Sequence, residues 1–577
     1  MRKTKIVCTI GPASMSPVVL EKMIEAGMNV ARVNFSHGTY QQHQKIINLV
    51  RKLAEKTQKP ICVMADLCGP KIRIGELKTD FVELKDGAKY ILTTKKVLGD
   101  DKEASVTYSG LIKDVPAGKR ILIDDGLLEL EVVSKNKTDL ICKVINGGKL
   151  YPHKGVNFPG TTLKVNALTK KDVKDAEFAV KHKVDYIAMS FVKEPKDVLQ
   201  LKDLILKQGS KIPVITKIEK HEACRNIEEI VKVADAVMVA RGDLGVEIPI
   251  EEVPLMQKKI IKLCNHYSKP VITATQLLDS MIRNPRPTRA EVTDIANAIF
   301  DGTDAVMLSG ETASGQYPVE AVKVMARVAE LNEKALKYED IMHKSTQSEN
   351  VTEAVSLATC EIAEEIHAHA IVTFTSSGRT ARRISKYKPR ARIIAVTETS
   401  PAQRRLNLSW GVQPIISLPT KDTDKLIHKG LEQAKKLKLI RDGDTAVVTA
   451  GIPAGVSGST NMIKVEVVGH VFLRGTGVGP KGIVKGKVCK ANSFEEARRK
   501  LDFGDVLIVN KLTEKYSAIL KKACGVITTE GHAGDHNNKI LDKFGLSGIL
   551  GVPNAMEVFS DAKVVTLDTN RGLVYTN

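Results

Sequence analysis

Short apolar segments recur along the first half of the chain, and an amphipathic segment usually follows each of them. They are rich in Val, Ile and Ala and nearly continuous in apolar character, which is typical of strands buried on both faces. Eight strands that alternate with helices predict a (β/α)8 barrel. A doubly wound open sheet is the alternative, but it would usually have fewer strands and a GxGxxG turn, and no such turn opens this region. The segments are TKIVCTIG, MNVARVNFS, PICVMADL, VDYIAMSFV, PVITKIE, DAVMVARGD, PVITATQ and DAVMLSGE.

The pattern changes between Lys71 and Lys164, where alternating strands and turns replace the strand–helix repeat, as in KRILIDDGLLELEVVS and DLICKVING. This texture predicts a small β domain inserted into a barrel loop, which is a common place for a mobile lid. We therefore expect the barrel to comprise residues 1–69 and 166–345, and the inserted domain to comprise residues 70–165.

The second half of the chain is predicted to hold two further domains. Helices and strands alternate again after the polar stretch YEDIMHKSTQSEN, which is interpreted as a linker, so an α/β domain is expected over residues 346–472. The glycine-rich run RGTGVGPKG is interpreted as a second linker. A last domain with many glycines and short strands is expected over residues 473–577.

Polar and charged side chains gather where the predicted barrel strands end. Lys217 and Glu219 are two residues apart, so they lie on one face of their strand. Chemistry in parallel barrels is found at the carboxyl ends of the strands. The other candidates at strand ends, or in the loop beyond them, are Arg32, Asn34, Ser36, Asp66, Lys71, Arg73, Arg241, Gly242, Asp243 and Thr275.

These residue types point to metal-assisted phosphoryl chemistry. Glu219 and Asp243 supply the oxygen ligands that Mg²⁺ or Mn²⁺ prefers. Arg32, Arg73 and Lys217 are placed to neutralise phosphoryl charge. A lone acid at a strand end is more often an ordinary salt-bridged residue, but an unpaired cluster of charges lowers stability, so a cluster favours a functional site.

The charge balance favours anionic partners. There are 87 Lys and Arg against 67 Asp and Glu, a formal charge of +20. Phosphorylated metabolites and nucleic acids both fit such a balance. The lysines are spread along the whole chain, without a basic block or interleaved aromatic residues, so we interpret them as solvated surface and expect no nucleic-acid partner.

The chain also lacks the marks of export. The apolar run in MRKTKIVCTIGP is too short for a signal peptide, and no stretch approaches the length of a membrane span. The nine cysteines are scattered and form no CxxC pair. Reduced thiols and a cytoplasmic location are therefore expected, with no membrane partner.

Several motifs together resemble the pyruvate kinase family: KIVCTIGPAS, ARVNFSHG, ITKIEKHE, MVARGDLGVEIP, ITATQLLDSMIRNPRPTRAE and DAVMLSGETASGQYP. The resemblance covers residues 1 to about 470 in order. It implies a barrel with an inserted lid, a carboxy-terminal effector domain and a homotetramer. The implied reaction is the last step of glycolysis, in which phosphoenolpyruvate and ADP give pyruvate and ATP.

The resemblance also implies roles for particular residues. Lys217 matches the lysine that stabilises the phosphoryl group and the enolate, and Glu219 and Asp243 match the Mg²⁺ ligands. Gly242 and Asp243 match backbone donors to the substrate carboxylate, and Thr275 matches the residue near the enolate carbon that receives a proton. Arg32 matches a phosphate clamp. Pro12, Asn34, His37 and Arg73 match the nucleotide region, with Arg73 also contacting the transferred phosphoryl.

One motif departs from the potassium-requiring members of the family. These read Asp-Thr-Lys-Gly-Pro-Glu, whereas this chain reads DLCGPK from Asp66 to Lys71. Asn34, Ser36 and Asp66 of the monovalent-cation region remain, but Leu67 has no side-chain oxygen and Lys71 supplies an ammonium instead of a carboxylate. We expect activity that needs Mg²⁺ or Mn²⁺ but not K⁺. The alternative is that Lys71 turns into solvent and K⁺ still binds.

A phosphate cradle is predicted in the α/β domain. The run TSSGRT, which comprises Thr375, Ser376, Ser377, Gly378, Arg379 and Thr380, follows a strand and precedes a basic helix. Backbone N–H groups at a helix start, hydroxyls and a guanidinium together bind phosphate. The resemblance implies a sugar-phosphate or nucleotide effector at this loop. The loop GIPAGVSGSTN either completes the site or is an ordinary turn.

The last domain resembles the mobile phosphohistidine domain of phosphoenolpyruvate-using enzymes, through ITTEG and GILGVPNA. The stretch GDHNNK places His536 at the position of the phosphorylated histidine, but its neighbours Asp535, Asn537 and Asn538 differ from the Thr-Ser-His-Ala-Ala run of that family. We therefore interpret the domain as a structural appendage and not as a phosphocarrier.

Two other functions stay open at this point. A barrel lyase or aldolase could form an enolate on the same metal without a nucleotide, although the arginines and the inserted lid weigh against it. A non-catalytic sensor could use TSSGRT alone, although intact Lys217, Glu219 and Asp243 weigh against that.

Overall fold

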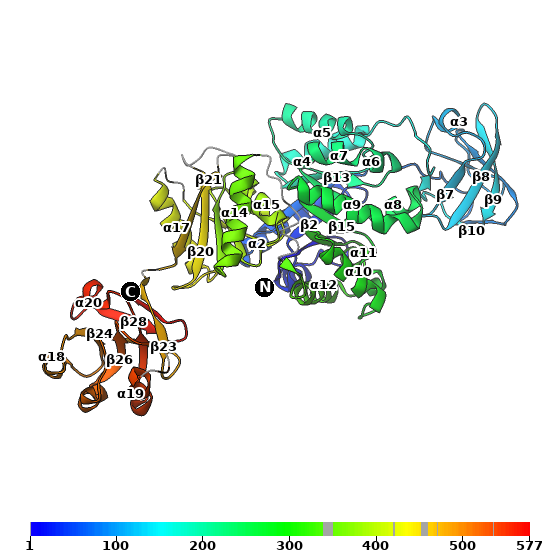
Figure 1. Ribbon diagram of the computed structural model, residues 1–577. Helices are drawn as coiled ribbons and strands as arrows, with labels where there is room; N and C mark the ends of the chain where they lie inside the picture. The colour runs from blue at the N-terminus through cyan, green and yellow to red at the C-terminus, as the bar shows by residue number, and fades with distance from the viewer. Residues whose placement is uncertain are drawn as a thin grey trace. The chain divides into compact units, whose positions relative to one another are not determined.

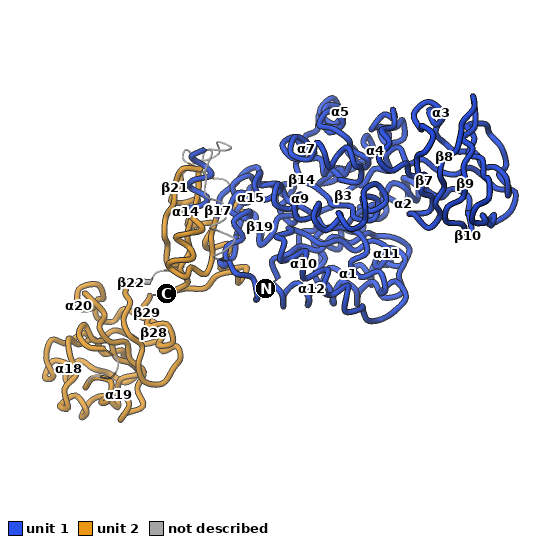
Figure 2. Tube along the Cα trace, turned by 45° about the vertical axis from the view of Figure 1, so that its right-hand side comes forward, with its two compact units in different colours: residues 1–357, 373–416, 455–459 blue, residues 358–372, 417–454, 460–577 orange. Residues whose placement is uncertain are grey.

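The computed structural model describes residues 2–338, 350–418, 420, 422–451, 460–469, 471–532, 534 and 536–576. Two compact units are distinguished in Figure 2. Of the described residues, those within 1–357 and 373–416 belong to unit 1, and those within 358–372, 417–454 and 460–577 belong to unit 2. The predicted linker YEDIMHKSTQSEN and the loop GIPAGVSGSTN lie largely outside the described residues, as does Asp535.

Unit 1 contains a closed barrel of eight parallel strands, which confirms the predicted (β/α)8 fold and excludes the open sheet. Around the barrel the order is β1, β2, β3, β12, β13, β14, β15 and β16. Strands β1, β3, β13 and β14 are buried along their whole length, because the barrel interior covers one face and the helices cover the other. The bounds are β1 Lys5–Thr9, β2 Val30–Asn34, β3 Cys62–Asp66, β12 Tyr186–Met189, β13 Val214–Ile218, β14 Ala236–Ala240, β15 Val271–Ala274 and β16 Ala305–Leu308.

Helices surround the barrel (Figure 1). Ser16, Thr39, Thr169 and Thr288 cap four of them, and each hydroxyl accepts the backbone N–H three residues later. The bounds are α1 Pro17–Ala26, α2 Tyr40–Lys56, α4 Lys170–Lys181, α5 Pro195–Lys207, α6 His221–Arg225, α7 Ile227–Val233, α8 Arg241–Glu247, α9 Val253–His266, α10 Arg289–Phe300, α11 Gly310–Ala313 and α12 Pro318–Glu333.

Alternate residues of the strands build two separate cores. Side chains such as Val7, Met64 and Met238 pack with one another in one cluster, whereas Ile6 and Val63 pack in the larger cluster with helix residues. This division follows from the two-residue period of a strand. Because all eight strands are parallel, their carboxyl ends lie at one rim, where the candidate side chains project.

The predicted β domain lies between β3 and β12 in the order of the chain. Figure 1 shows its strands as a group of their own. It has a six-stranded sheet of order β11-β7-β8-β9-β5-β6 and a two-stranded sheet, β10-β4. Its own hydrophobic core makes it an independent module of unit 1. The bounds are β4 Val82–Leu84, β5 Lys89–Thr93, β6 Glu103–Ser105, α3 Leu111–Asp114, β7 Arg120–Ile123, β8 Leu128–Lys135, β9 Asp139–Asn146, β10 Gly148–Leu150 and β11 Val156–Asn157.

Helices and strands alternate after residue 350, as expected of an α/β domain. Its five-stranded sheet has the order β19-β18-β17-β20-β21. The bounds are α14 Val351–Glu365, β17 Ala370–Phe374, α15 Arg379–Lys386, β18 Arg392–Thr397, α16 Ser400–Leu406, β19 Val412–Ile416, α17 Thr423–Lys436, β20 Thr445–Gly451 and β21 Thr460–Val467.

The last part of the chain folds around an eight-stranded sheet of order β22-β29-β28-β24-β25-β26-β27-β23. The run RGTGVGPKG was expected to be a linker, and this is wrong, because it contributes the end of β22 and all of β23. The expected boundary between residues 472 and 473 falls inside β22. The bounds are β22 Val471–Arg474, β23 Thr476–Val478, β24 Ile483–Lys490, α18 Phe494–Lys500, β25 Asp505–Val509, β26 Ala523–Thr528, α19 His536–Phe544, β27 Ser547–Leu550, α20 Ala555–Val558, β28 Val564–Asp568 and β29 Leu573–Thr576.

Two expectations about the whole chain can be compared with the structure. All nine cysteines lie in the described part, and each is a free thiol there. None of the described helices combines the length and the apolar character that a membrane crossing requires.

Candidate active site at the barrel rim

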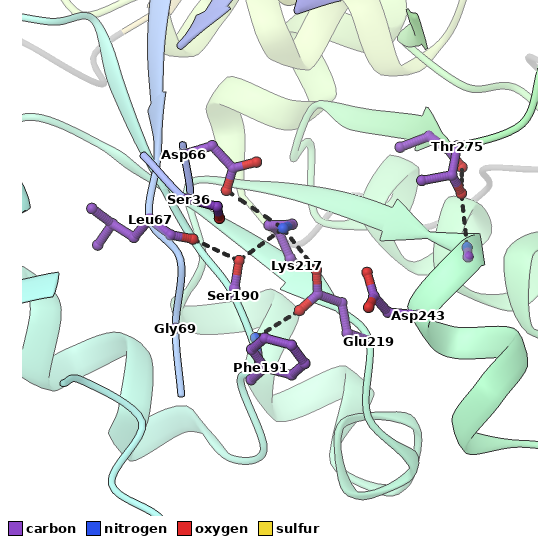
Figure 3. Close-up of polar contacts among 12 residues, drawn as sticks. Ser36, Asp66, Leu67, Gly69, Ser190, Phe191, Lys217, Glu219, Asp243 and Thr275 are labelled. Carbon is purple, nitrogen blue, oxygen red and sulfur yellow. Dashed lines mark hydrogen bonds and ion pairs between the residues drawn. The ribbon is translucent and has the colours of Figure 1, made fainter. Parts of the chain in front are cut away.

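The ammonium of Lys217 lies at the centre of a buried polar cluster at the end of β13 (Figure 3). Its Nζ is 2.7 Å from Glu219 Oε1 and 3.5 Å from Asp66 Oδ1. It also donates a hydrogen bond of 2.7 Å to Ser190 Oγ. Three neighbouring strands, β3, β12 and β13, thus direct polar groups to one point.

Burial alone would lower the pKa of Lys217, but the carboxylates of Asp66 and Glu219 outweigh it and raise the pKa above its ordinary value. Lys217 is therefore a permanent cation at neutral pH. The pKa of Asp66 shifts in the opposite direction. Burial raises it, but the positive charges of Lys217 and Arg32 together lower it below the ordinary value. The cluster consequently holds a fixed positive charge in a site shielded from water.

Arg32 lies beside this cluster at the end of β2. Its Nε donates to Asp66 Oδ2 at 2.6 Å, and its Nη1 donates to Thr9 Oγ1 at 2.8 Å. Nη2 makes no hydrogen bond within the described residues. The guanidinium is thus fixed in orientation and keeps a donor for an anion.

Glu219 and Asp243 fit a divalent cation. Burial raises the pKa of Glu219; Lys217 opposes this rise and Asp243 adds to it. Glu219 Oε1 lies 2.7 Å from Lys217 Nζ but accepts no well-aligned hydrogen bond from the described residues. Figure 3 shows the Asp243 carboxylate beside it. A cation between them would relieve their repulsion.

No third His, Cys, Asp or Glu completes a metal-binding group in the described part of the chain. Mg²⁺ usually keeps several waters and binds through one or two carboxylates plus substrate oxygens. A two-carboxylate site open on one side is therefore the donor set that Mg²⁺ takes when phosphate oxygens complete its shell.

Thr275, at the end of β15, has a backbone φ of +71°, which is rare for a β-branched residue. Its Oγ1 accepts the N–H of Gly242 at 2.8 Å and donates to the carbonyl of Ala274 at 2.6 Å. Arg241 supports this turn by donating to the Thr275 carbonyl at 2.7 Å. Strain that is held by such a network is typical of a functional position.

Gly242 was expected to offer its N–H to a substrate carboxylate, but the hydroxyl of Thr275 already accepts it. The two residues therefore act as one unit, and a bound carboxylate would have to share or replace this hydrogen bond.

The two basic residues predicted in the loop beyond β3 lie in different places. Lys71 reaches the rim, with Nζ 3.6 Å from Asp243 Oδ1. Arg73 instead donates from Nη1 to the carbonyl of His153 at 2.9 Å, on the inserted domain. The structure therefore brings Lys71 to the candidate metal ligand and does not join Arg73 to the Lys217 cluster.

The residues predicted for the nucleotide and for a monovalent cation lie at or just beyond the ends of β1, β2 and β3. Asn34 Oδ1 accepts the N–H of Ser36 at 3.1 Å, and Pro12 and His37 are exposed. Figure 3 shows that the Leu67 side chain points away from Lys217. The Leu67 carbonyl accepts the hydroxyl of Ser190 at 2.8 Å.

Two contacts of the cluster were missed from the sequence. Ser190 directly follows β12, and Phe191, with φ of +56°, donates its N–H to Glu219 Oε2 at 2.8 Å. Ser190 obeys the same strand-end rule that selected the other candidates. The backbone role of Phe191 leaves no signal in the sequence.

The predicted phosphate cradle forms a tight turn into α15. Gly378 has φ of +80° and donates its N–H to Thr375 Oγ1 at 2.9 Å. Ser376, Ser377 and Arg379 are exposed and Thr380 is buried. One backbone N–H of the cradle is thus already satisfied by a side chain of the same loop.

His536 is the first residue of α19 and is exposed. Asn537 is buried and accepts the N–H of Leu512 through its side-chain oxygen at 2.8 Å. The asparagine that departs from the phosphohistidine motif therefore has a structural role here.

Models of known families match most of the chain. The model described as the barrel domain of pyruvate kinase matches residues 1–322, and the model described as the alpha/beta domain of pyruvate kinase matches residues 353–466. The model of the mobile domain of PEP-utilising enzymes matches residues 501–572.

Curated relatives match over the full length. A pyruvate kinase of Geobacillus stearothermophilus is 46% identical over 579 residues, covering 100% of this chain and 98% of the relative. A pyruvate kinase of Bacillus licheniformis is also 46% identical, over 580 residues, covering 100% of this chain and 99% of the relative. Among solved structures, a pyruvate kinase from Cryptosporidium parvum superposes with a TM-score of 0.77 at 39% identity, covering 81% of this chain and 96% of that one.

Proposed function

The chain belongs to the pyruvate kinase family, and we propose that the cluster around Lys217 performs the family's reaction. In that reaction the bond between phosphorus and the enol oxygen of phosphoenolpyruvate breaks, and a bond to a β-phosphate oxygen of ADP forms. The enolate left behind takes a proton at carbon and becomes pyruvate. The observation that carries this assignment is the Lys217 ammonium held between two buried carboxylates at the barrel rim.

The raised pKa of Lys217 decides its role. A lysine that stays charged stabilises the negative charge that develops on the phosphoryl group and the enolate oxygen, and does not serve as the proton donor. Arg32 holds the phosphoryl group from the side, through the guanidinium fixed by Asp66. We assign delivery of the proton to the hydroxyl of Thr275, which gives its proton to the enolate carbon, directly or through water, and takes another from solvent.

The family generally uses Mg²⁺. When bound, this ion polarises phosphoryl oxygens and neutralises their charge. Glu219 and Asp243 would hold it here, and Lys71 lies close enough to Asp243 to add positive charge at the same edge. Pro12, Asn34 and His37 are our candidates for the nucleotide side of the site, with Arg73 approaching from the inserted domain.

The metal assignment predicts that Asp243→Asn raises the half-saturating concentration of Mg²⁺ by at least about tenfold, because one of two charged ligands is lost. The measurement is the initial rate against Mg²⁺ at saturating substrates. Asp279→Asn is the matched control, since Asp279 pairs with Arg283 at 2.9 Å and is not part of the Lys217 cluster. An equal requirement in both variants would remove Asp243 from the metal site.

We further propose regulation by a phosphorylated effector at residues 375–380. The turn around Gly378 and the exposed hydroxyls and guanidinium support it. Arg379→Ala is expected to weaken effector activation or inhibition at least about tenfold, because a charge-assisted hydrogen bond is lost, with the basal KM nearly unchanged. Dose–response curves test this, with Lys436→Ala on α17 as the control. A full response in Arg379→Ala places the effector elsewhere.

The carboxy-terminal domain is proposed to be dispensable for turnover. Its core is built from its own strands and helices, and His536 lacks the usual neighbours of a phosphohistidine. A chain that ends at Gly469, before β22, is expected to keep kcat within about threefold. It loses the hydrogen bond from Arg571 Nη1 to the Asp442 carbonyl, 2.9 Å long, so a small decrease in Tm is expected.

Turnover and Tm of the purified truncated chain are measured together. A folded truncated chain with almost no turnover would contradict this role. So would phosphate found on His536 after the full chain is incubated with phosphoenolpyruvate. A homotetramer and a cytoplasmic location complete the proposal, and the resemblance to the family supports both.

A further inference from the structure

A cavity of about 460 Å³ lies at the opposite end of the barrel from the active site. Its lining includes Pro213, Asp235 and Lys269, which precede β13, β14 and β15, together with residues of α15 and the turn before it. All of these residues belong to unit 1. The basic side chains that line it are Lys211, Lys269, Arg379, Arg382, Arg383 and Arg405.

The two carboxylates in the lining are already neutralised by cations outside this basic set. Asp235 Oδ2 lies 2.8 Å from Lys202 Nζ and accepts the N–H of Val214 at 2.9 Å. Glu353 forms an ion pair with Lys386. The six cations therefore outnumber the two carboxylates of the lining, and each carboxylate already has a cation closer to it than any of the six.

The hydrogen bonds of the basic set go to backbone carbonyls. Lys269 Nζ donates to the backbone carbonyl of Ala234 at 2.6 Å, and Arg405 Nε donates to the backbone carbonyl of Asp185 at 3.2 Å. None of the six basic residues has a carboxylate within 4.0 Å among the described residues. Carbonyls are weak partners for guanidinium groups, which favour carboxylate or phosphate.

Burial and the closeness of other cations lower the pKa values of two of these basic side chains. Burial lowers the pKa of Arg383, and the nearby guanidinium of Arg379 lowers it further. Burial also lowers the pKa of Lys269; Asp235 opposes this fall, and Lys202 and Arg382 add to it. Cations that outnumber the counter-charges of a pocket destabilise the fold unless an anion is bound, so such a cluster indicates a site.

We propose that this cavity binds a phosphate monoester of a small metabolite. A dianionic phosphate accepts the paired N–H groups of arginine, and a volume of about 460 Å³ lies in the range of small-molecule sites. Tyr267 and Ser268 also line the cavity and provide a ring and a hydroxyl for the organic part. Sugar phosphates and nucleoside monophosphates share this chemistry.

The site differs from the active site and from the loop of residues 375–380. Ligands here touch no reacting atom, because Lys217, Glu219 and Thr275 lie at the other ends of β13 and β15. Only Ser377 and Arg379 of the loop line the cavity. The inference rests on no step of the proposed catalysis, and a bound ligand would act as a regulator.

Isothermal titration calorimetry on the full chain tests the inference. The probes are ribose 5-phosphate, adenosine 5′-monophosphate and inorganic phosphate. The double variant Lys269→Gln/Arg383→Gln removes two cavity cations outside the loop. Lys262→Gln, an exposed lysine on α9 away from the cavity, is the matched control. Ser376→Ala alters the loop at a residue outside the cavity lining.

At least one of the two esters is expected to bind, and the double variant is expected to weaken it at least about tenfold. Lys262→Gln is expected to leave the affinity unchanged. Ser376→Ala is expected to leave the affinity of the cavity unchanged while weakening any second binding event at residues 375–380. Which ester binds more tightly distinguishes a sugar-phosphate site from a nucleotide site. Without ligand, the double variant is expected to have a Tm no lower than the parent chain, since it relieves repulsion, and to lose the ligand-induced rise in Tm.

Three results would overturn the inference: no binding of either ester, binding that the double variant does not change, or binding of inorganic phosphate alone. Loss of binding in Ser376→Ala but not in the double variant would assign the effector to residues 375–380 instead. That outcome would uphold the proposed regulation while rejecting the cavity.

Discussion

Replacing Lys217 by Met is expected to lower kcat at least about 10³-fold, because the fixed cation that stabilises the transferring phosphoryl group and the enolate is lost. No other described ammonium lies within 4.0 Å of both Glu219 and Asp66, so no neighbour can take its place. The measurement is single-turnover transfer at saturating substrates and Mg²⁺.

The same substitution removes the counter-charge of two buried carboxylates. The free energy of unfolding is expected to fall by about 3 kcal/mol, the usual effect of breaking a buried ion pair. The pKa of Glu219 would rise further, so Mg²⁺ binding is retained but weakens as the pH falls, because the proton and the ion compete for one carboxylate. Lys217→Arg, which keeps the charge, is the matched variant for stability.

Circular dichroism shows whether the variant is folded, and electron paramagnetic resonance measures its binding of Mn²⁺. Together they separate these effects. A folded Lys217→Met protein that binds Mn²⁺ and turns over at a rate near the parent rate would show that Lys217 is not the catalytic cation.

Full activity is expected without K⁺. In tetramethylammonium buffer the initial rate should change by less than about tenfold when KCl is added at matched ionic strength, a factor that corresponds to about 1.4 kcal/mol of transition-state stabilisation. The Lys71 ammonium is 3.6 Å from Asp243 Oδ1 and supplies positive charge at this edge of the site. A K⁺ ion close to it would be repelled by up to about 4 kcal/mol at an effective dielectric constant near 20.

Lys71→Gln is expected to lose most of its activity, and Lys78→Gln provides the control, since Lys78 pairs with Asp100 at 2.8 Å on the surface. A tenfold or larger stimulation of the parent protein by K⁺ would show that Lys71 does not replace the ion.

Strand periodicity located much of the site from the sequence. Lys217, Glu219 and Asp243 were selected because polar residues at the ends of apolar strands converge on one rim, and the structure places them together. Ser190 follows the same rule. Arg73 shows its limit, because a residue in a loop beyond a strand is directed by the domain into which that loop leads, here toward His153.

Glycine content misled the interpretation of RGTGVGPKG. Glycine runs often form flexible linkers, but here the missing side chains allow close backbone packing. A Cβ on Gly477 would lie 2.0 Å from the Thr569 carbonyl oxygen, and one on Gly475 would lie 2.4 Å from that of Leu550. Sequence alone does not distinguish these two uses of glycine.

The basic cavity was also beyond prediction. Lys211 and Lys269 precede barrel strands, whereas Arg379, Arg382 and Arg383 belong to a helix of the α/β domain more than a hundred residues later. The local pattern selected Arg379 alone, as part of a phosphate cradle, and does not distinguish the other cations from solvated surface, which is how the net charge was interpreted. Only the tertiary fold gathers them.

One measurement tests the central claim most directly: release of pyruvate and ATP by the purified full chain with phosphoenolpyruvate and MgCl₂, with and without ADP. The account predicts that both products appear in equal amounts and that neither appears when ADP or Mg²⁺ is omitted. Pyruvate released at an undiminished rate without ADP, or no turnover by the folded protein with all components present, would contradict it.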